Sequence, residues 1–280
     1  MSAAPTLKLE RSLMAEGHRL IAAVDEVGRG ALAGPVSVGV VLVDVTVARS
    51  LRGVRDSKLL PPARREALVD GIRRWSVGCA VGHAGPEEID DVGLTAALGI
   101  AGRRALGQLQ SVPDVVLLDG NHDWISGRGL QLDLLGSADV DDTASVHVPP
   151  VVTSIKADMR CSSVAAASVL AKVARDAIMV ESAQQFPGFG WEVNKGYGTV
   201  AHRERIAAVG PTPLHRQTWR LIADPVVGAG DGLGEDLGGG VGEDLGDAVG
   251  EDLGDAVGLA ADGGLSDLPG QAVRPIGVEA

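Results

Sequence analysis

The sequence predicts an α/β fold in which short buried strands are separated by helices. Two apolar runs, Leu20–Val24 and Val36–Val43, flank a glycine-rich turn and indicate a buried β-hairpin. Two more apolar strands, at 114–118 and 151–155, each lead to an acidic residue. Helical patterns lie between these strands, which is the arrangement typical of a sheet covered by helices.

The amino-terminal part begins with residues 1–17, which we expect to form a loose arm, with Leu13 and Met14 able to dock. After the hairpin, a polar loop at 54–62 leads into a helix whose start is marked by proline. This helix has one apolar face, formed at i, i+4 and i+7 spacing by Leu68, Ile72 and Trp75.

Strands and helices then continue to residue 209. The predicted strands are 77–81, 114–118 and 151–155, and the predicted helices are 86–109, 164–180 and 201–209. Ser162 or Ser163 is expected to cap the helix at 164, and Thr199 the helix at 201. The stretch 121–150 has no clear period, so we expect an irregular loop insertion within a catalytic domain that spans 18–222.

Residues 223–280 form a separate acidic, glycine-rich tail. The motif G-E-D-L-G recurs at 234–238, 242–246 and 250–254, a period of eight. Leucine is the only large side chain in each unit, so the tail cannot bury enough surface to offset its ordering entropy, and we predict disorder. A stacked solenoid is the alternative, but three units of eight residues are too short for it.

The charge of the chain is concentrated in this tail. The net charge is −12, and residues 226–280 contain twelve acids and one arginine, which leaves the first 225 residues at −1. Charge therefore gives no argument against a nucleic-acid partner. The two cysteines, Cys79 and Cys161, fit a reducing cytoplasm, and the absence of a long uncharged apolar run predicts no membrane span.

Four carboxylates follow the predicted buried strands. Asp25 and Glu26 end the first apolar run, while Asp119 and Asp158 follow the next two strands. Clustered carboxylates repel and raise one another's pKa, and a hard divalent cation, Mg²⁺ or Mn²⁺, relieves that repulsion. Taken singly, each acid could instead cap a helix or turn, and His122 beside Asp123 fits a loop surface better than a ligand position.

Asp25 and Glu26 are adjacent, so on a regular strand their side chains would point to opposite faces. Sharing one site would require a strand end or a bulge. The following G-x-G-x-x-x-G stretch, Gly28–Gly34, resembles a dinucleotide loop, but Pro35 and a β-branched run come next where such a loop needs a helix. The glycines more plausibly turn the hairpin or let the backbone approach a ligand.

Several basic and aromatic residues are candidate contacts. Arg29 and Lys58 lie in glycine-rich or polar loops and could hold phosphates, although each could equally be a surface charge. Lys172 and Asp176 are spaced i, i+4 and can simply pair. Tyr197, the single tyrosine, stands between two glycines, which favours a contact role over a core role.

Seven motifs together make the sequence resemble bacterial ribonuclease HII over residues 12–222. In order they are D-E-V-G-R-G (25–30), D-S-K-L (56–59), L-L-D-G (117–120), K-A-D (156–158), A-A-A-S-V-L-A-K-V-A-R-D (165–176), G-Y-G-T (196–199) and H-R-Q-T-W (215–219). The resemblance implies a ribonuclease H-like fold: a mixed five-stranded sheet flanked by helices, with a carboxy-terminal helical extension. The chain departs from the family pattern at Ala157, at Trp219, in the long 121–150 segment and in the acidic tail.

The resemblance also implies an activity and a site. The implied reaction is endonucleolytic cleavage of RNA in RNA–DNA hybrids and incision at single ribonucleotides in duplex DNA, by two-metal hydrolysis with Mn²⁺ or Mg²⁺. The implied catalytic and metal residues are Asp25, Glu26, Asp119 and Asp158, and the implied substrate contacts are Gly28, Arg29, Gly30, Lys58 and Tyr197. We expect a cytoplasmic monomer. The alternatives are a related nuclease such as a junction resolvase, or a binding module whose acidic tail recruits a basic protein.

Overall fold

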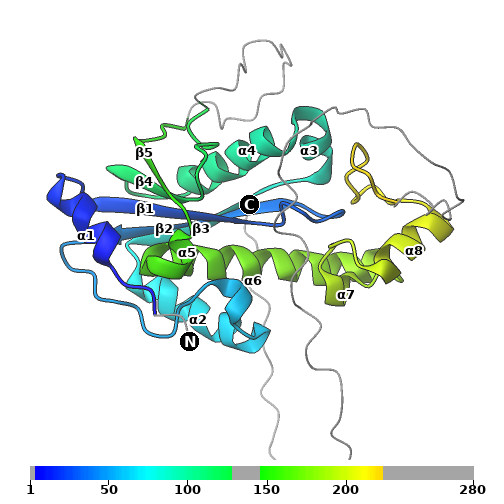
Figure 1. Cartoon of the computed structure of the whole chain (residues 1–280), viewed down its shortest axis with the longest axis horizontal. Coiled ribbons are helices and arrows are strands. Elements are labelled where there is room, and N and C mark those ends of the chain that lie inside the picture. The colour runs from blue at the N-terminus through cyan, green and yellow to red at the C-terminus, as the bar shows by residue number, and fades with distance from the viewer. Residues whose placement is uncertain (1–3, 128–145, 223–280) are drawn as a thin grey trace, which may run out of the picture. The chain divides into compact units, whose positions relative to one another are not determined.

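A five-stranded mixed sheet forms the centre of the computed structural model, which describes residues 4–127 and 146–222 (Figure 1). The strands lie in the order β3-β2-β1-β4-β5. Their bounds are β1 Leu20–Val27, β2 Val36–Asp44, β3 Gly78–Ala84, β4 Val115–Asp119 and β5 Val151–Ser154. β1, β2 and β3 pair antiparallel, whereas β1, β4 and β5 pair parallel, so the carboxyl ends of the three parallel strands meet at one edge.

Helices cover both faces of this sheet. Figure 1 shows α6 and α2 on one side, with α3 and α4 on the other. The helical segments in the described residues are α1 Lys8–Ala15, the 3₁₀ turn η1 Ser57–Leu59, α2 Pro62–Trp75, α3 Pro86–Val92, α4 Leu94–Gly107, α5 Ala157–Arg160, α6 Ser162–Gln185, α7 Trp191–Asn194 and α8 Val200–Val209. The predicted ribonuclease H-like architecture is thus the one observed.

The β1–β2 hairpin is the most deeply buried part of the sheet. Its register runs from Leu20 opposite Asp44 to Val27 opposite Ser37, which confirms the predicted hairpin. Successive residues face opposite sides, so Ile21 and Ala23 pack with α6 and α2 in one core cluster. Burial on both faces explains why both strands are nearly continuous apolar runs instead of alternating with polar residues.

Two glycines allow the long helices to approach the sheet closely. A Cβ on Gly39 would lie 2.3 Å from the carbonyl oxygen of Ala167 in α6, and one on Gly82 would lie 2.0 Å from that of Ala101 in α4. These positions therefore accept no side chain without displacing a helix. Gly39 pairs with Asp25, so the contact with α6 occurs directly beside the first predicted carboxylate.

The amino-terminal segment differs from the expected loose arm. Residues 8–15 form helix α1, and Leu13 is buried as expected, whereas Met14 remains exposed. Thr6 forms a parallel bridge with Cys161, and Thr6 N donates to Arg160 O at 2.9 Å. No local pattern predicts this attachment, because the partner residues lie some 150 positions away.

Two predicted helices also have different ends. The segment 86–109 is divided into α3 and α4 by Gly93, whose positive φ of +79° breaks the helix. Helix α6 begins at Ser162, and neither Ser162 nor Ser163 caps it; the Ser163 amide instead donates to Glu10 Oε1 at 3.1 Å. The predicted cap of α8 is confirmed, because Thr199 accepts from His202 N at 3.3 Å.

Part of the predicted 121–150 loop is packed. Trp124 and Ile125 are buried in the α4-side cluster, and Asp123 accepts hydrogen bonds from Ile125 N and Ser126 N. His122 is exposed, as expected for a loop surface. Residues 128–145 and the predicted disordered tail at 223–280 lie outside the described residues. Across 4–127 and 146–222, none of the helices combines the length and apolarity needed to span a bilayer.

Candidate metal centre and nucleic-acid site

Two of the predicted carboxylates lie next to each other on neighbouring parallel strands. Val24 of β1 pairs with Leu118 of β4, so the next residues along, Asp25 and Asp119, are side by side at the carboxyl end of the sheet. Parallel strands are spaced about 4.8 Å apart. Both side chains belong to the sheet face covered by α6, because Ala23 and Leu117, two residues earlier, pack in that cluster.

Asp158 is held at the same place by the turn that follows β5. Lys156 adopts a left-handed conformation with φ of +55°, and helix α5 begins directly after it. Ala157 N donates to Asp119 Oδ1 at 2.6 Å, and the Asp158 amide also donates to that carboxylate. Asp119 is the last residue of β4, and its carboxylate accepts hydrogen bonds from the first turn of α5. These bonds hold Asp158 close to Asp119.

Glu26 is placed differently from the other three acids. It lies opposite Val38 in a β1–β2 register without a bulge, but it is the last residue but one of β1 and so stands at the strand end. Its Cβ leaves the strand on the opposite side from that of Asp25, while its carboxylate still interacts with the charges of Asp25 and Asp119. Glu26 Oε1 pairs with Arg29 Nη1 at 3.1 Å, while Oε2 is buried without a hydrogen-bond partner.

Burial raises the pKa of all four acids, and repulsion by neighbouring carboxylates adds to this for Asp25, Glu26 and Asp158. Asp25 is 6% exposed, and its pKa is raised well above the usual value, first by burial and then by the charges of Glu26, Asp119 and Asp158. Burial is also the main cause for Asp119 and Glu26. Burial and the charge of Asp119 raise the pKa of Asp158 to about 6. The four carboxylates therefore share one electrostatic site.

The donor set fits a hard divalent cation. Among the described residues, no three or more His, Cys, Asp or Glu side chains already stand in a metal-binding arrangement, which agrees with the opposite direction of Glu26 and with carboxylates that repel one another. The strand register and the α5 amides nevertheless bring Asp25, Asp119 and Asp158 to one edge of the sheet. Buried carboxylates and the unpartnered Glu26 Oε2 offer the oxygen ligands that Mg²⁺ and Mn²⁺ prefer.

Lys58 lies at the rim of this acidic site. It is exposed in the 3₁₀ turn η1. Burial of its ammonium group lowers the pKa, but the charges of Asp56, Asp25 and Asp158 outweigh that effect and raise it. The Oγ atoms of Ser57 in this turn and Ser168 in α6 lie 2.9 Å apart, and Ser168 also hydrogen-bonds to Asp25.

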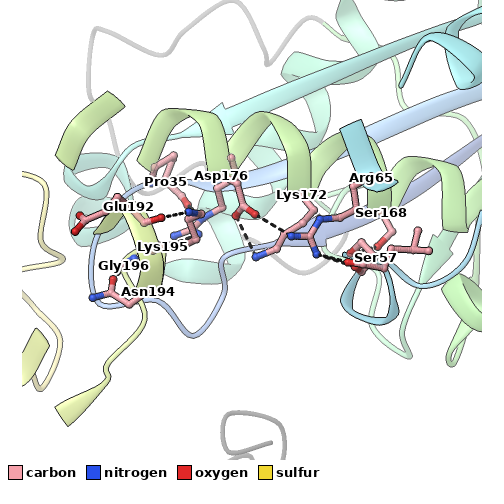
Figure 2. A network of polar contacts seen from close by, with 12 residues as sticks. Pro35, Ser57, Arg65, Ser168, Lys172, Asp176, Glu192, Asn194, Lys195 and Gly196 are labelled. Carbon is pink, nitrogen blue, oxygen red and sulfur yellow. Dashed lines mark hydrogen bonds and ion pairs between the residues drawn. The ribbon is translucent and has the colours of Figure 1, made fainter. Parts of the chain in front are cut away.

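A network on α6 connects the η1 loop with the turn that carries Tyr197. Figure 2 shows Asp176 between Lys172 and Arg65; its carboxylate lies 3.0 Å from Lys172 Nζ and 3.4 Å from Arg65 Nη2. Arg65 Nη1 donates to Ser57 O at 2.9 Å. The predicted Lys172–Asp176 pair is confirmed. It belongs to a network that also includes Arg65 and Ser57, which helix spacing alone does not indicate.

Tyr197 is half-buried beside two cations of α6. The Lys172 ammonium lies 5.8 Å from its ring centroid and the Arg175 guanidinium 5.4 Å. Tyr197 also forms an antiparallel bridge with Ala31, so it borders the loop that contains Gly28, exposed Arg29 and exposed Gly30.

Sequence reasoning missed the buried residues that support this loop. Arg175, Arg216, His202 and His215 have no exposed surface. Charged and polar residues inside the alanine-rich α6 and in the H-R-Q-T-W motif were the available signal, but their partners are backbone carbonyls that no spacing rule predicts.

Comparisons with known proteins agree with this site. A family model described as Ribonuclease HII matches residues 22–222. Ribonuclease HII of Streptomyces avermitilis is 45% identical over 219 residues, covering 78% of this chain and 84% of the relative. The Paracoccus denitrificans ribonuclease HII is 43% identical over 221 residues, covering 78% and 93%. The crystal structure of ribonuclease H2 from Pyrococcus horikoshii has a TM-score of 0.55 at 30% identity, covering 72% of this chain and 94% of that one.

These matches extend over the whole sheet, α6 and the carboxy-terminal helices. They favour a ribonuclease over the alternatives of a junction resolvase or a non-enzymatic binding module. The chain therefore belongs to the ribonuclease HII family and is a hydrolase of the ribonuclease H class, an endonuclease that acts on RNA in RNA–DNA hybrids.

Proposed function

We propose that this chain also incises duplex DNA on the 5′ side of a single embedded ribonucleotide, using one site for both substrates. The observation that carries the proposal is geometric: Asp25 and Asp119 lie side by side at the carboxyl ends of neighbouring parallel strands, and the α5 amides that donate to Asp119 bring Asp158 to the same place. Ligands in open α/β sheets bind at such strand ends.

Asp25, Glu26, Asp119 and Asp158 would hold two divalent cations, Mg²⁺ or Mn²⁺. When bound, such a pair activates the attacking water and stabilises the departing 3′-oxygen, which leaves a 5′-phosphate and a 3′-hydroxyl. The α5 amides that donate to Asp119 fix the direction of that carboxylate. Ser168 fixes Asp25 in the same way, so both ligands are oriented before any cation arrives.

The basic residues at the rim would hold the nucleic-acid backbone. Lys58 is an exposed residue of η1 whose charge interacts with those of Asp25 and Asp158, so it can pair with a phosphate next to the scissile bond. Arg29 has a half-exposed guanidinium, held on one side by Glu26. Phosphate contacts of this kind position a strand but carry no information on the sugar.

Selection of the ribonucleotide would come from four residues, which we call the ribonucleotide-contact set: Gly28, Arg29, Gly30 and Tyr197. The 2′-hydroxyl is the group that separates RNA from DNA. A site built to hydrogen-bond a hydroxyl can reject the analogue that lacks it by about 10⁴-fold. Backbone groups of 28–30 and the Tyr197 phenol would supply those bonds.

The proposed setting is a cytoplasmic monomer in which the acidic tail plays an accessory part. A basic protein is the partner that the tail's charge would suit. Deletion of residues 226–280 is expected to leave cleavage intact.

The main test uses a DNA duplex with one ribonucleotide, assayed with Mg²⁺, with Mn²⁺ and with chelator. We expect a single cut on the 5′ side of the ribonucleotide in either metal and none in chelator. Asp119→Asn should lower cleavage at least about a thousandfold, because it removes a ligand of the metal ions, whose charges stabilise the transition state by several kcal/mol. The circular dichroism spectrum of the variant should match that of the parent. Undiminished cleavage by the variant would remove Asp119 from the mechanism.

A second measurement addresses the ribonucleotide-contact set. Tyr197→Ala is expected to lower incision at a single ribonucleotide more than it lowers cleavage of an RNA–DNA hybrid. Equal incision by the variant and the parent would exclude Tyr197 from the set. An all-DNA four-way junction, which should remain uncut, serves as the control substrate.

A further inference from the structure

A buried dipeptide, His215-Arg216, lies beneath the ribonucleotide-contact set. Arg216 Nη2 donates to Gly28 O at 2.6 Å and Nη1 donates to Arg29 O at 2.7 Å. The same guanidinium reaches Gly34 O at 3.2 Å, and its charge lies 4.6 Å from the centroid of the Trp219 ring. One side chain thus satisfies the carbonyls of the loop that turns the β1–β2 hairpin.

The neighbouring histidine reaches Tyr197 through a second histidine. His215 Nε2 and His202 Nε2 are 3.1 Å apart, and His202 Nδ1 lies 2.8 Å from the Tyr197 carbonyl oxygen. Trp191 Nε1 donates to His202 Nε2 at 3.0 Å, and Thr212 N donates to His215 Nδ1 at 2.9 Å. These contacts form one chain from the Thr212 amide to the backbone of Tyr197.

The two fixed donors determine where the protons of this chain lie. The Thr212 amide can only donate, so His215 Nδ1 accepts and its proton is on Nε2. The Trp191 indole can only donate, so His202 Nε2 accepts and its proton is on Nδ1. His202 Nδ1 therefore donates to Tyr197 O, and His215 Nε2 directs its proton toward His202 Nε2, the acceptor that it shares with the Trp191 indole.

Neutral rings are required for this arrangement, and burial favours them. Both histidines have no exposed surface. Burial lowers the pKa of His202, and burial together with the neighbouring His202 lowers the pKa of His215 to about 4. At neutral pH both rings are uncharged, so the hydrogen-bond directions derived above are the ones that apply.

The two segments that His215 and Arg216 support, the glycine loop and the turn with Tyr197, also contact each other directly. Leu32 N donates to Gly196 O at 2.8 Å, and Arg216 N donates to Leu32 O at 3.0 Å. Ala31 bridges Tyr197, and Ala33 bridges His215. The separation between the glycine loop and Tyr197 is thereby fixed by residues that lie out of reach of the substrate.

We propose that His202, His215 and Arg216 are positioning residues that set the spacing within the ribonucleotide-contact set, and so set the preference for a ribonucleotide flanked by DNA. This inference rests on the proposed function, because it assumes that Gly28–Gly30 and Tyr197 contact the sugar together. These three residues would act through the groups that they hold.

The test compares kcat/KM for two substrates, a duplex with one ribonucleotide and a full RNA–DNA hybrid. Arg216→Lys keeps the charge but loses the planar fork, so we expect the ratio of the two kcat/KM values to fall about tenfold. His202→Gln places its amide at the Nε2 position and should lower the ratio similarly. His202→Asn places an amide donor at the Nδ1 position and should keep the ratio within about threefold of the parent.

Leu106→Ala is the matched control, since it removes a buried side chain of α4 in the opposite cluster and should lower stability without changing the ratio. Equal losses on both substrates in Arg216→Lys and His202→Gln would mean a general structural role and would overturn the inference. An equal effect of His202→Asn and His202→Gln would overturn the hydrogen-bond chain. If the parent does not cut the single-ribonucleotide duplex, the proposed function itself fails; if the parent cuts and the variants keep its ratio, only this inference fails.

Discussion

Asp25 and Asp119 are held by contacts with neutral groups, whereas Glu26 also pairs with Arg29. Asp119 accepts two amides of α5, and Asp25 is approached by Ser168. These are hydrogen bonds from neutral groups, which orient a carboxylate but offset only part of the cost of its burial. Such a carboxylate lowers the stability of the metal-free protein, and binding of a cation offsets that loss.

Asp158 gives a pH-dependent test of that cost in metal-free buffer. Its folded pKa of about 6 lies above the ordinary value of 3.8, so the folded state holds the proton more tightly. Its ionisation therefore lowers stability fully above pH 6 and not at all below pH 4. Asp158→Asn should be more stable than the parent at pH 7.5, by about 1 kcal/mol after allowance for solvent screening, and the difference should vanish at pH 4.

Urea denaturation with chelator present, at pH 4, 6 and 7.5, measures this difference. Asp70→Asn, an exposed acid of α2, is the control and should show little change with pH. A stability difference that is the same at all three values would contradict the assignment of the raised pKa to Asp158.

At the scale of the element, α6 connects most parts of the site. Ser168 of this helix lies beside Asp25, and Lys172 and Arg175 lie beside Tyr197. Further along the helix, Asp176 pairs with Arg65 (Figure 2). The helix can serve all of them only because Gly39 lets it lie against β2. Its seating on the sheet is therefore a condition for the geometry of the site.

Gly39→Ala should disturb that seating. The added Cβ would lie 2.3 Å from the Ala167 carbonyl oxygen and 3.2 Å from the Ala171 Cβ, so we expect a loss of about 1–3 kcal/mol from overpacking and a lower kcat. Gly71→Ala is the control, since a Cβ there meets nothing within 4 Å in helix α2, and it should raise stability by up to about 1 kcal/mol. Thermal and urea melts with single-turnover cleavage rates test both variants; a fully active, stable Gly39→Ala would refute the packing argument.

The extent of successful prediction also differs between elements. Apolar runs predicted the β1–β2 hairpin and the strands that lead to Asp119 and Asp158, because both rest on local patterns of burial. The predicted serine cap of α6 was wrong, since the first two amides of the helix bind Thr6 O and Glu10 instead of a local serine side chain. For Glu26 the sequence left a strand end and a bulge as alternatives; the β1–β2 register has no bulge, and Glu26 is the last residue but one of the strand. Long-range partners to buried polar groups leave no periodic trace in a sequence.

At the scale of the whole molecule, the first described residues pack against the start of α6, the helix that lies along the site. Helix α1 brings Glu10, which has no exposed surface, to the start of α6. Glu10 Oε1 accepts from Ser163 N at 3.1 Å and from Ser163 Oγ at 2.6 Å. The beginning of the chain therefore stabilises a helix that starts about 150 residues later.

Glu10→Ala should leave those two donors without an acceptor and create a cavity, at a cost of about 2–4 kcal/mol. Glu10→Gln keeps an acceptor and the side-chain volume, so it should cost less than half as much. Glu16→Ala, on the exposed side of the α1 carboxyl end, serves as control. Chemical denaturation ranks the three variants; equal stability of Glu10→Ala and Glu16→Ala would show that the contact contributes nothing.

The parallel order of β1, β4 and β5 has a consequence for how activity arises during synthesis. Asp25, Asp119 and Asp158 come from strands joined by long crossovers, and such non-local pairings form slowly because loop closure must come first. A chain still on the ribosome has an incomplete set of acids until residue 158 has emerged. Hydrolysis of RNA–DNA hybrids can therefore begin only after the whole sheet and the start of α5 have been translated and have closed together.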